Sequence, residues 1–293
     1  MILAYTPQFA LEPLLATLRQ QGWKLHPTNE PEEMLLADTA DIVITSPLEY
    51  ASTLGVVDYA LVPQFGVFTG GFAGMLNLMF NQRLTSINSV AVHQPHGFAA
   101  LIARIVLLEK HNLAPRLIPV PANSTVDQML AVADAALVAG DNAIFDDSGK
   151  RSMFDLSDEW EDMAETMLPC LVAWGRLGKC TEQQLQGFAA AAHQAGLAIP
   201  DAAANSANPR LAGRFHGRYL RGDIRYGLRE KEDLPALTAL YRYLFYHGMI
   251  QDMPALKYLP DGAPAGQPPP TLSAPPEAAP NKAANNQPNQ PNE

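Results

Sequence analysis

Short apolar runs alternate with amphipathic stretches along the first half of the chain, and this alternation constrains the fold more than any other feature. Short apolar runs are typical of buried strands, whereas apolar residues at helical spacing are typical of surface helices. We predict strands at residues 2–5, 24–26, 41–45, 60–65, 90–93, 116–120 and 135–139. We predict helices at residues 12–21, 31–36, 47–53, 98–111 and 126–132. Strand–helix–strand units with right-handed crossovers form a parallel sheet, so the sequence predicts an α/β fold.

The second half of the chain changes pattern twice. After Thr181 we predict only helices, at residues 182–195, 209–231 and 234–247. This helical block either forms a separate domain or returns to cover the first lobe, which requires a chain that crosses between lobes twice. From Pro260 onward the sequence is rich in Pro, Ala, Asn and Gln, and it cannot bury enough apolar surface to offset its ordering entropy. We predict a disordered tail, either a solubilising appendage or a docking motif built on residues 268–270.

Charge and cysteine content narrow the partners. The formal net charge is −10, which disfavours attraction to nucleic acid or to an anionic membrane and favours small molecules or proteins as partners. Two cysteines are too few for a disulfide framework or a zinc cluster, which is typical of a reducing compartment. The N-terminus lacks a basic signal region and no apolar run approaches about 20 residues, so we expect a cytoplasmic protein. Nothing in the sequence specifies an oligomeric state.

The first candidate site is a helix start that directly follows a buried strand. Ser46 and Glu49 have the spacing of a capping box, with Pro47 at the first helical position. Ligands of open α/β sheets bind at such strand ends, because free N–H groups and the helix dipole favour an anion. Ser46 is therefore either a plain helix cap or a ligand contact, and the two roles are compatible.

A second helix start follows the strand at residues 90–93. His93 and His96 precede Gly97, which permits close approach of the backbone to a ligand. The two histidines are surface residues, ligand contacts or catalytic groups, and two histidines alone do not make a metal site.

The glycine-rich segment 68–74 lacks the spacing of a phosphate-binding loop, so no nucleotide is indicated. We interpret it as a turn or hinge whose backbone donors can line a cleft. No motif of a serine hydrolase or a zinc protease occurs, and Cys170 lies in an apolar run typical of a packed thiol.

Charged residues concentrate in two segments. Acidic residues are frequent between residues 141 and 165, and arginines recur every three or four residues further on. That spacing predicts one helical stripe, which either attracts a polycarboxylate or is a solvated face paired with acidic neighbours. The arginines are Arg210, Arg214, Arg218, Arg221, Arg225 and Arg229.

Four stretches of the chain carry a family resemblance. They are ADIVITSPLEYA at 40–51, residues 90–110, DAALVAGDNA at 134–143, and residues 154–174, which contain FDLSDEW and LPCLVAW. In order and spacing these stretches resemble the menaquinone biosynthesis family of the futalosine pathway, most closely its chorismate dehydratases. The likeness covers roughly residues 1–250.

The resemblance implies the two-lobed fold of type II periplasmic binding proteins, used inside the cell as an enzyme. One lobe would comprise residues 1–86 and 181–258, and the other residues 87–180. Residues 259–293 would form the disordered tail. This arrangement accounts for a helical block that returns to the first lobe.

The resemblance also implies a reaction. Chorismate dehydratases eliminate water from chorismate to give 3-[(1-carboxyvinyl)oxy]benzoate, without a metal or organic cofactor. Ser46 matches the family's serine before the first cleft helix, and Gly140 and Asp141 match its strand-end Gly-Asp. The glycine loop, with Thr69 and Gly70, would contribute further contacts to the substrate.

Several positions depart from the family pattern. Ala10 stands where the family has an asparagine important for activity, and Met75 replaces a hydroxyl residue of the glycine loop. His93 and Gly97 stand where an acidic residue and small hydroxyl residues are expected. Gln8, two residues from the lost asparagine, is a candidate to replace its amide.

The leading hypothesis is a dehydratase-like lyase acting on chorismate or a related carboxylate in the interlobe cleft. Gln8, His93 and His96 are its proton-handling candidates, in that order. One alternative is a non-catalytic cytoplasmic solute-binding or sensor protein for a small carboxylate. The other is an enzyme similar to 1,4-dihydroxy-6-naphthoate synthases, which belong to the same pathway and use a histidine.

Overall fold

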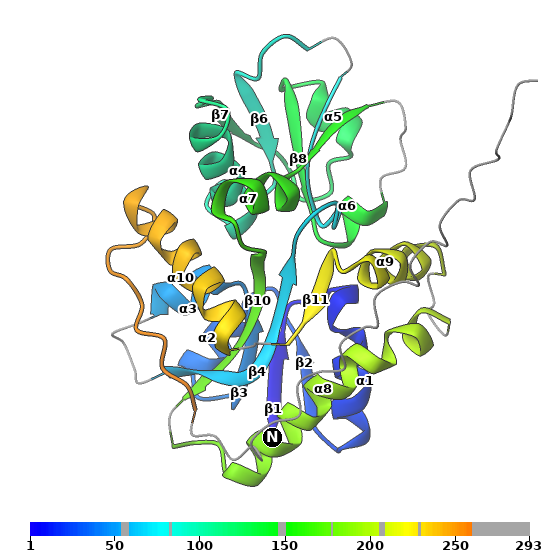
Figure 1. Ribbon diagram of the computed structural model, residues 1–293, viewed down its shortest axis with the longest axis vertical. Coiled ribbons are helices and arrows are strands. Elements are labelled where there is room, and N and C mark those ends of the chain that lie inside the picture. The colour runs from blue at the N-terminus through cyan, green and yellow to red at the C-terminus, as the bar shows by residue number, and fades with distance from the viewer. Residues whose placement is uncertain are drawn as a thin grey trace, which may run out of the picture. The chain divides into compact units, whose positions relative to one another are not determined.

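The structure is a computed structural model that describes residues 1–53, 59–81, 84–145, 151–176, 178–204, 209–227 and 230–259. All of them fall within one compact unit, which contains two β-sheets flanked by helices (Figure 1). The predicted tail lies outside the described residues except for Leu259, which is buried in the core and donates its N–H to the Leu61 carbonyl. The chain is therefore packed up to residue 259, one residue further than predicted.

The first sheet has six strands in the order β11-β4-β10-β3-β1-β2. Strand β1 pairs in parallel with both β2 and β3, whereas β10 is antiparallel to both β3 and β4. The sheet is therefore mixed rather than purely parallel as predicted. Its strands are β1 (Ile2–Tyr5), β2 (Lys24–Pro27), β3 (Ile42–Thr45), β4 (Tyr59–Thr69), β10 (Leu168–Arg176) and β11 (Ile224–Tyr226).

The second sheet has five strands in the order β7-β6-β8-β5-β9. Strand β6 pairs in parallel with β7 and β8, and β5 pairs antiparallel with β8 and β9. Its strands are β5 (Leu76–Phe80), β6 (Ser89–Val92), β7 (Arg116–Pro119), β8 (Ala135–Ala139) and β9 (Ser152–Asp155).

Strand pairing decides where the chain crosses between the sheets. Strand β5 precedes residue 86 but belongs to the second sheet, and β10 precedes residue 180 but belongs to the first. The crossings therefore lie between β4 and β5 and between helix α7 (Leu156–Ala164) and β10, not near residues 86 and 180. The predicted boundaries followed changes in sequence pattern, whereas hydrogen-bonded partners decide sheet membership.

Helices cover both faces of the first sheet (Figure 1). Val43 belongs to one core cluster, and its neighbours Ile42 and Ile44 belong to another, because alternate side chains of a strand point to opposite faces. The first cluster packs with α2 (Pro31–Leu36), α3 (Pro47–Thr53) and α10 (Glu230–Tyr246). The second packs with α1 (Glu12–Gln20), α8 (Glu182–Ala204) and α9 (Pro209–Arg221).

Both clusters extend into the second lobe, so the two lobes share apolar cores. The first includes side chains of α4 (Phe98–Glu109) and α7, and the second includes Ile144 of α6 (Asp141–Phe145). A short helix, α5 (Val126–Leu130), packs against β6 and β8. At the centre of the first sheet Trp174 is fully buried between Tyr50 and Tyr59, and its Nε1 donates to Thr45 Oγ1 at 2.8 Å.

Several predictions of secondary structure are confirmed and several are wrong. Strands 2–5 and 135–139 and helices 31–36 and 47–53 have the predicted bounds. The predicted helix 209–231 ends at Arg221, because Gly222 adopts a positive φ and β11 then pairs with the edge of β4. Strands β5, β9, β10 and β11 were not predicted. Their sequences lack the strand–helix alternation, and their partners are antiparallel and distant in the chain.

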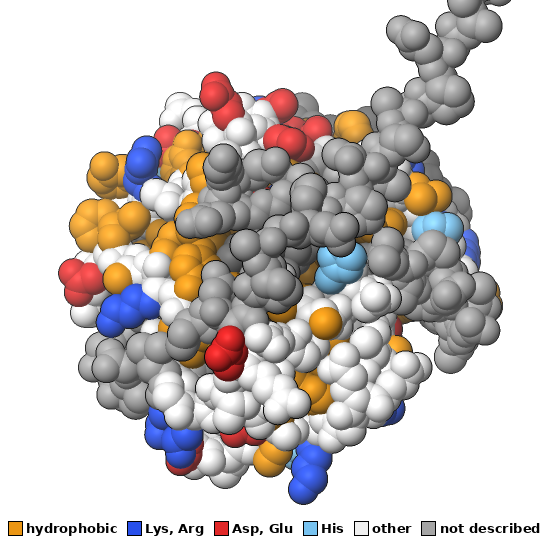
Figure 2. Space-filling view, turned by 60° about the horizontal axis from the view of Figure 1, so that its bottom comes forward, with side chains coloured by type: hydrophobic (Ala, Val, Ile, Leu, Met, Phe, Trp, Pro, Cys, Tyr) orange, Lys and Arg blue, Asp and Glu red, His pale blue; other side chains and the backbone are white. Residues whose placement is uncertain are grey.

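Neither a membrane-spanning helix nor, on the face in Figure 2, a basic patch is evident among the described residues. Among the described residues no helix combines the length and apolarity that a bilayer crossing requires. On the face in Figure 2 the Lys and Arg side chains that the described residues contribute lie apart from one another rather than gathering in a patch.

Candidate functional site

The start of α3 lies at the carboxyl end of β3. Ser46 Oγ accepts the Leu48 N–H at 3.3 Å and its hydroxyl donates to the Glu49 carboxylate, so Ser46 caps the helix. Burial raises the pKa of Glu49, and the hydrogen bond from Ser46 only partly offsets this. The negative charge of Glu32 raises the pKa of Glu49 further. Among the described residues no Lys or Arg contributes to this shift. The Ser46 hydroxyl is thus engaged within its own helix.

The start of α4 lies at the carboxyl end of β6 and differs from that of α3. Its N-cap is Gly97, which has an extended backbone and makes no side-chain capping hydrogen bond. His93 is half-buried; its Nε2 is buried and has no hydrogen-bond partner among the described residues. His96 is exposed. The second lobe therefore presents an uncapped helix start with one unengaged imidazole nitrogen close by in sequence.

Two residues separate β1 from Gln8, which is the N-cap of a short 3-10 helix, η1 (Phe9–Leu11), that leads directly into α1. Gln8 is half-buried and its side chain makes no capping hydrogen bond. The Phe9 N–H is taken by the Asp141 carboxylate of the second lobe, at 3.0 and 3.1 Å. Ala10 is fully buried and its carbonyl accepts the Tyr226 hydroxyl, so this position is part of the core.

Thr69, the last residue of β4, is fully buried. Its Oγ1 lies 2.9 Å from Ser157 Oγ and 3.1 Å from Cys170 Sγ. Burial raises the pKa of the Cys170 thiol to about 12, consistent with the packed thiol expected from the sequence. A ligand would reach the Thr69 hydroxyl only by displacing these two side chains.

The glycine-rich segment is held by carboxylates and a backbone carbonyl. Gly70 is buried and donates its N–H to the Asp223 carbonyl at 2.9 Å. Gly71 donates to Glu161 Oε2 at 2.8 Å, and Gly74 donates to Asp155 Oδ2 at 2.5 Å. These three hydrogen bonds hold the segment in place where the chain crosses between the sheets, and the interpretation of this segment as a turn or hinge stays a prediction.

At two of these glycines the ends of charged side chains occupy the space that a Cβ would need. A Cβ on Gly70 would lie 2.3 Å from Glu161 Oε2, and one on Gly74 would lie 1.2 Å from Arg218 Nη1. Gly74 also has a φ of +65°, which disfavours other residues. The guanidinium of Arg218 occupies the space that the missing side chain leaves and donates to the Ala73 carbonyl.

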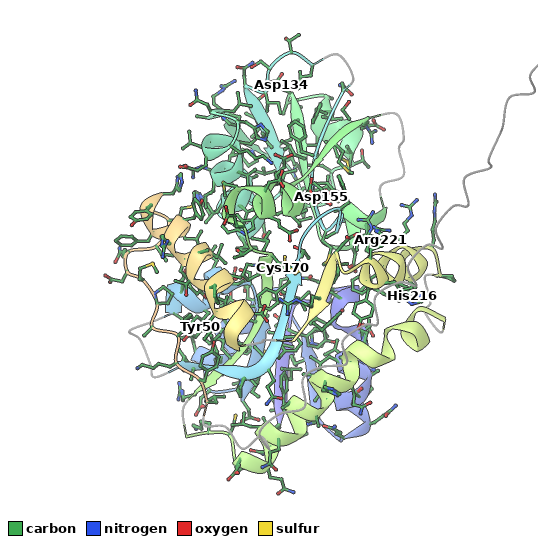
Figure 3. The ribbon with its side chains drawn as sticks, in the orientation of Figure 1. Tyr50, Asp134, Asp155, Cys170, His216 and Arg221 are labelled. Atoms are coloured by element: carbon green, nitrogen blue, oxygen red, sulfur yellow. The ribbon has the colours of Figure 1, made fainter. Side chains whose placement is uncertain are left out.

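Asp155 is the most perturbed carboxyl near the crossings (Figure 3). Its side chain is 4% exposed and accepts the Ser157 N–H at 3.0 Å, which caps α7. Burial raises its pKa to about 6, although the hydrogen bonds from Gly74 and Ser157 and the nearby Arg218 act in the other direction. Figure 3 labels it close to the segments that connect the two sheets.

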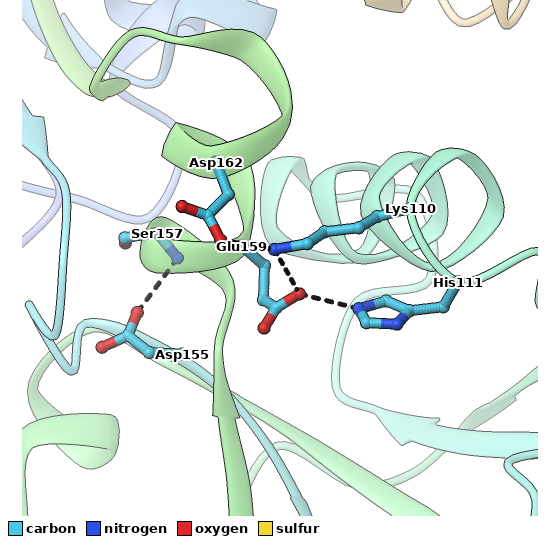
Figure 4. Close-up of polar contacts among 6 residues, drawn as sticks. All are labelled: Lys110, His111, Asp155, Ser157, Glu159 and Asp162. Atoms are coloured by element: carbon cyan, nitrogen blue, oxygen red, sulfur yellow. Dashed lines mark hydrogen bonds and ion pairs between the residues drawn. The ribbon is translucent and has the colours of Figure 1, made fainter.

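Helix α7 is also tied to α4 on its outer face. Glu159 accepts from His111 Nε2 at 2.7 Å and lies 3.0 Å from Lys110 Nζ, as Figure 4 shows. Lys110 pairs further with Asp162 at 2.9 Å. The crossing helix is thus anchored on the second lobe through its surface charges as well as through its cap.

The arginine series does not form one helical stripe as predicted. Arg225 lies on β11, where it pairs with Asp233 and stacks over Phe68 at 4.9 Å, and Arg229 lies outside the described residues. On α9, Arg214 donates to the Ile144 carbonyl at 2.9 Å. Its neighbour Arg218 donates to the Ala73 carbonyl. These two side chains join the first lobe to the second.

Gly140 and Met75 meet at the end of β8. Gly140 has a φ of +63° and donates its N–H to the Met75 carbonyl at 2.8 Å, while the Met75 side chain is buried in the second core cluster. No group of metal-ligating side chains occurs within the part of the chain that the structure describes.

The structure places Asp141 next to the segment that contains Gln8, but among the described residues no hydrogen bond joins the other predicted site residues to one another. Asp141 contacts the residue after Gln8, whereas Ser46 and Thr69 are each engaged with side chains of their own surroundings. Their roles in ligand binding stay predictions, as do those of Gly70, Gly97 and Gly140.

Sequence reasoning missed Asp155, Ser157 and Glu161. The Asp that precedes Leu-Ser-Asp-Glu has the pattern of a helix N-cap, so this role could have been predicted from the sequence. Its contact with the glycine-rich segment is not readable, because the partners are 81 residues apart in the chain.

Comparisons with known proteins show the family and the fold of this chain. A family model described as menaquinone biosynthesis matches residues 10–246. The chain belongs to the menaquinone biosynthesis family. In this family member the match includes both crossings and every described strand except β1, and helix α10 ends at the last matched residue. No curated protein sequence matches the chain.

Solved structures show the fold. A structural-genomics protein from Archaeoglobus fulgidus is 15% identical, with a TM-score of 0.62 over 85% of this chain and 98% of its own. An ABC transporter from Parabacteroides distasonis is 13% identical, with a TM-score of 0.63 over 89% and 98%. A Candida albicans gene product, described as having the generic periplasmic binding protein fold, is 11% identical, with a TM-score of 0.55 over 86% and 91%. The family member thus has the two-lobed periplasmic-binding-protein-like fold expected from the resemblance.

Proposed function

We propose that this protein is a cytoplasmic chorismate dehydratase-like lyase of the futalosine pathway of menaquinone biosynthesis. It eliminates water from chorismate and releases 3-[(1-carboxyvinyl)oxy]benzoate. The observation that carries the proposal is the family match over residues 10–246, which includes every candidate site residue except Gln8. The substrate would lie between the lobes, where α3 and α4 begin at strand ends of different sheets.

The uncapped start of α4 supports a carboxylate at this end of the second lobe. Backbone N–H groups at a helix start attract anions, and Gly97, the N-cap residue of this helix, makes no side-chain capping hydrogen bond. Gly97 adds no side chain of its own in front of these groups, and Gln94 is the side chain nearest to the space that a Cβ would fill. Ser46 would hold the other carboxylate group of the substrate by exchanging its hydrogen bond to Glu49 for one to the ligand.

The elimination requires a ring proton to be removed and a ring hydroxyl to leave as water. A side chain that accepts the ring proton and returns it to the leaving hydroxyl balances the reaction without any further reactant. His93 is supported in this role by its buried Nε2, which has no partner among the described residues. Gln8 would orient the substrate through its half-buried amide, and the exposed His96 is the weakest of the three candidates. Proton transfer of this kind contributes typically 10²- to 10⁴-fold in rate.

The test is to incubate the purified protein with chorismate and follow substrate and product by mass spectrometry. We expect loss of chorismate and appearance of the vinyl-ether benzoate in equal amounts. His93→Ala should lower turnover by at least about 10²-fold, while His26→Ala, at an exposed histidine of β2, serves as the matched control and retains most activity. A wild-type protein that leaves chorismate unchanged contradicts the proposal.

A second candidate is a solute-binding protein without catalysis. It is favoured by the engagement of Ser46, Thr69 and the glycine-rich segment within the protein itself, which leaves fewer groups for chemistry. Thermal stabilisation by chorismate without product would identify it.

A third candidate is an enzyme similar to 1,4-dihydroxy-6-naphthoate synthases. The unengaged His93 nitrogen favours it, because those enzymes use a histidine. Formation of the naphthoate from a cyclic futalosine compound, with chorismate left intact, would identify it.

A further inference from the structure

One hydrogen bond joins the backbone beside a predicted catalytic residue to the opposite lobe. Asp141 is the first residue of α6, directly after β8 of the second sheet, and Phe9 follows Gln8 after β1 of the first. The Asp141 carboxylate accepts the Phe9 N–H through both oxygens, at 3.0 and 3.1 Å, across 132 residues of sequence. The contact therefore sets the distance between two segments that belong to different sheets.

A second contact attaches the other end of α6 to the first lobe. Arg214 of α9 donates to the Ile144 carbonyl at 2.9 Å. Ile144 is fully buried in the same apolar cluster as Phe9 and Phe215, whose rings meet edge to face with centroids 5.1 Å apart. The helix is thus docked by one directional polar contact at each end and by apolar packing between them.

The Asp141 carboxylate depends on the Phe9 N–H more than on any cation. Burial raises its pKa, the Phe9 N–H lowers it, and the nearby Glu12 raises it again. Among the described residues no Lys or Arg acts on this carboxyl group. A partly buried carboxylate without a cation is costly unless a donor satisfies it, so this donor holds the group in place.

We propose that Asp141 is a positioning residue: it clamps the Gln8–Phe9 backbone to α6, so that the two lobes present their groups to one substrate at a fixed separation. The inference rests on the proposed function for the reaction it serves, and on the Asp141–Phe9 contact for its geometry. Asp141 does not take part in the proton transfer. It acts through the position of Gln8.

Kinetic measurements separate positioning from a purely structural role. Asp141→Ala should lower kcat for chorismate by roughly 10²-fold, because small misplacements of reacting groups cost that much, while KM changes less than about threefold. Asp141→Asn keeps an oxygen acceptor for the Phe9 N–H and should restore kcat to within about fivefold of wild type. Asp162→Ala removes an exposed carboxylate from the same lobe and is the matched control, with unchanged kcat.

Hydrogen exchange tests the contact without using activity. In Asp141→Ala the amides of residues 9–11 should exchange about tenfold faster, and those of Asp141→Asn and Asp162→Ala should match wild type. Wild-type exchange or wild-type kcat in Asp141→Ala overturns the proposal while leaving the proposed function intact. If wild type does not convert chorismate, the proposed function fails; faster exchange in Asp141→Ala then still upholds the clamp between the lobes.

Discussion

Helices α4 and α7 pack against each other in the second lobe, yet they begin in opposite ways. Helix α7 begins at Asp155, a buried carboxylate that caps the helix and also holds Gly74 of the crossing segment. Helix α4 begins at Gly97, has no side-chain cap, and follows a half-buried histidine whose Nε2 has no partner among the described residues.

This difference separates a structural helix start from one that is available to a ligand. Unpaired donors at a helix start are normally satisfied by side chains, water or ligands. At α7 Asp155 accepts one of these donors, the Ser157 N–H, and also holds Gly74 of the crossing segment, so a side chain of the protein already occupies this helix start. At α4 the donors are left to solvent or to an anion. Helix α3 is intermediate between α7 and α4. Its start is capped by the Ser46 hydroxyl, and a ligand could take the place of that hydroxyl as the acceptor of the Leu48 N–H.

The largest expected effect comes from breaking the satisfied start. Asp155→Ala leaves the buried N–H groups of Gly74 and Ser157 without their acceptor, and we expect a loss of about 2–4 kcal/mol in the free energy of unfolding. Urea denaturation measures it. Asp158→Ala, one turn into the same helix, is the control and should cost less than about 1 kcal/mol; equal losses would contradict the role of Asp155.

The pH dependence of the free energy of unfolding tests the burial of Asp155 in a second way. The pKa of Asp155 is raised from 3.8 to about 6 in the folded protein. A raised pKa means that the stabilisation from protonation is fully present below pH 3.8 and is lost as the pH rises through about 6.

Relative to Asp155→Asn, the wild type should therefore gain on the order of 2–3 kcal/mol between pH 7 and pH 4. Urea denaturation of both proteins across that range provides the measurement. The same pH dependence in both would show that another group is responsible.

An intermediate effect is expected at α3. Ser46→Ala removes the acceptor of the Leu48 N–H and the donor to Glu49, which should cost about 1 kcal/mol of stability. If Ser46 also holds a ligand carboxylate, chorismate affinity should fall by about tenfold, as measured by calorimetry. Ser52→Ala, at the end of the same helix, is the control for both measurements. Equal chorismate affinity in the two variants would assign Ser46 to the cap alone, and equal stability would contradict the cap.

The smallest change in stability is expected at the uncapped start. Gly97→Ser supplies a cap, but its Cβ would lie 3.0 Å from Gln94 Oε1, so the net change should stay within about 0.5 kcal/mol. The new hydroxyl competes with a ligand for the same N–H groups, so chorismate affinity should fall. Unchanged affinity, measured by calorimetry alongside the thermal unfolding of the variant, would remove α4 from the binding site.

Much of the fold was readable because local patterns determine it. Helix α3 has its predicted bounds because Ser46, Pro47 and Glu49 specify its first turn within four residues. Strand β10 was not predicted because it pairs antiparallel with β3 and β4, and nothing in its apolar run indicates which strands it pairs with. The end of α9 was missed because β11 is defined by its pairing with β4.

The candidate site was readable to a lesser extent. The two helix starts and the strand-end position of Asp141 follow from patterns of a few residues. What these groups contact does not, because Thr69 meets Ser157 and Phe9 meets Asp141 across 88 and 132 residues. Hydrogen-bond partners at such separations depend on how the two sheets are connected.

By itself, the sequence determined the α/β class, most helices, the strand–helix order of the first half and, through its motifs, the menaquinone biosynthesis family. These are properties of local periodicity and local capping, which act within a few turns of the chain. Only the tertiary structure decided which sheet each crossing strand joins, that the glycine-rich segment is held by Asp155 and Glu161, and that Asp141 contacts Phe9. These contacts join residues far apart in the chain, and burial makes each of them depend on the whole fold.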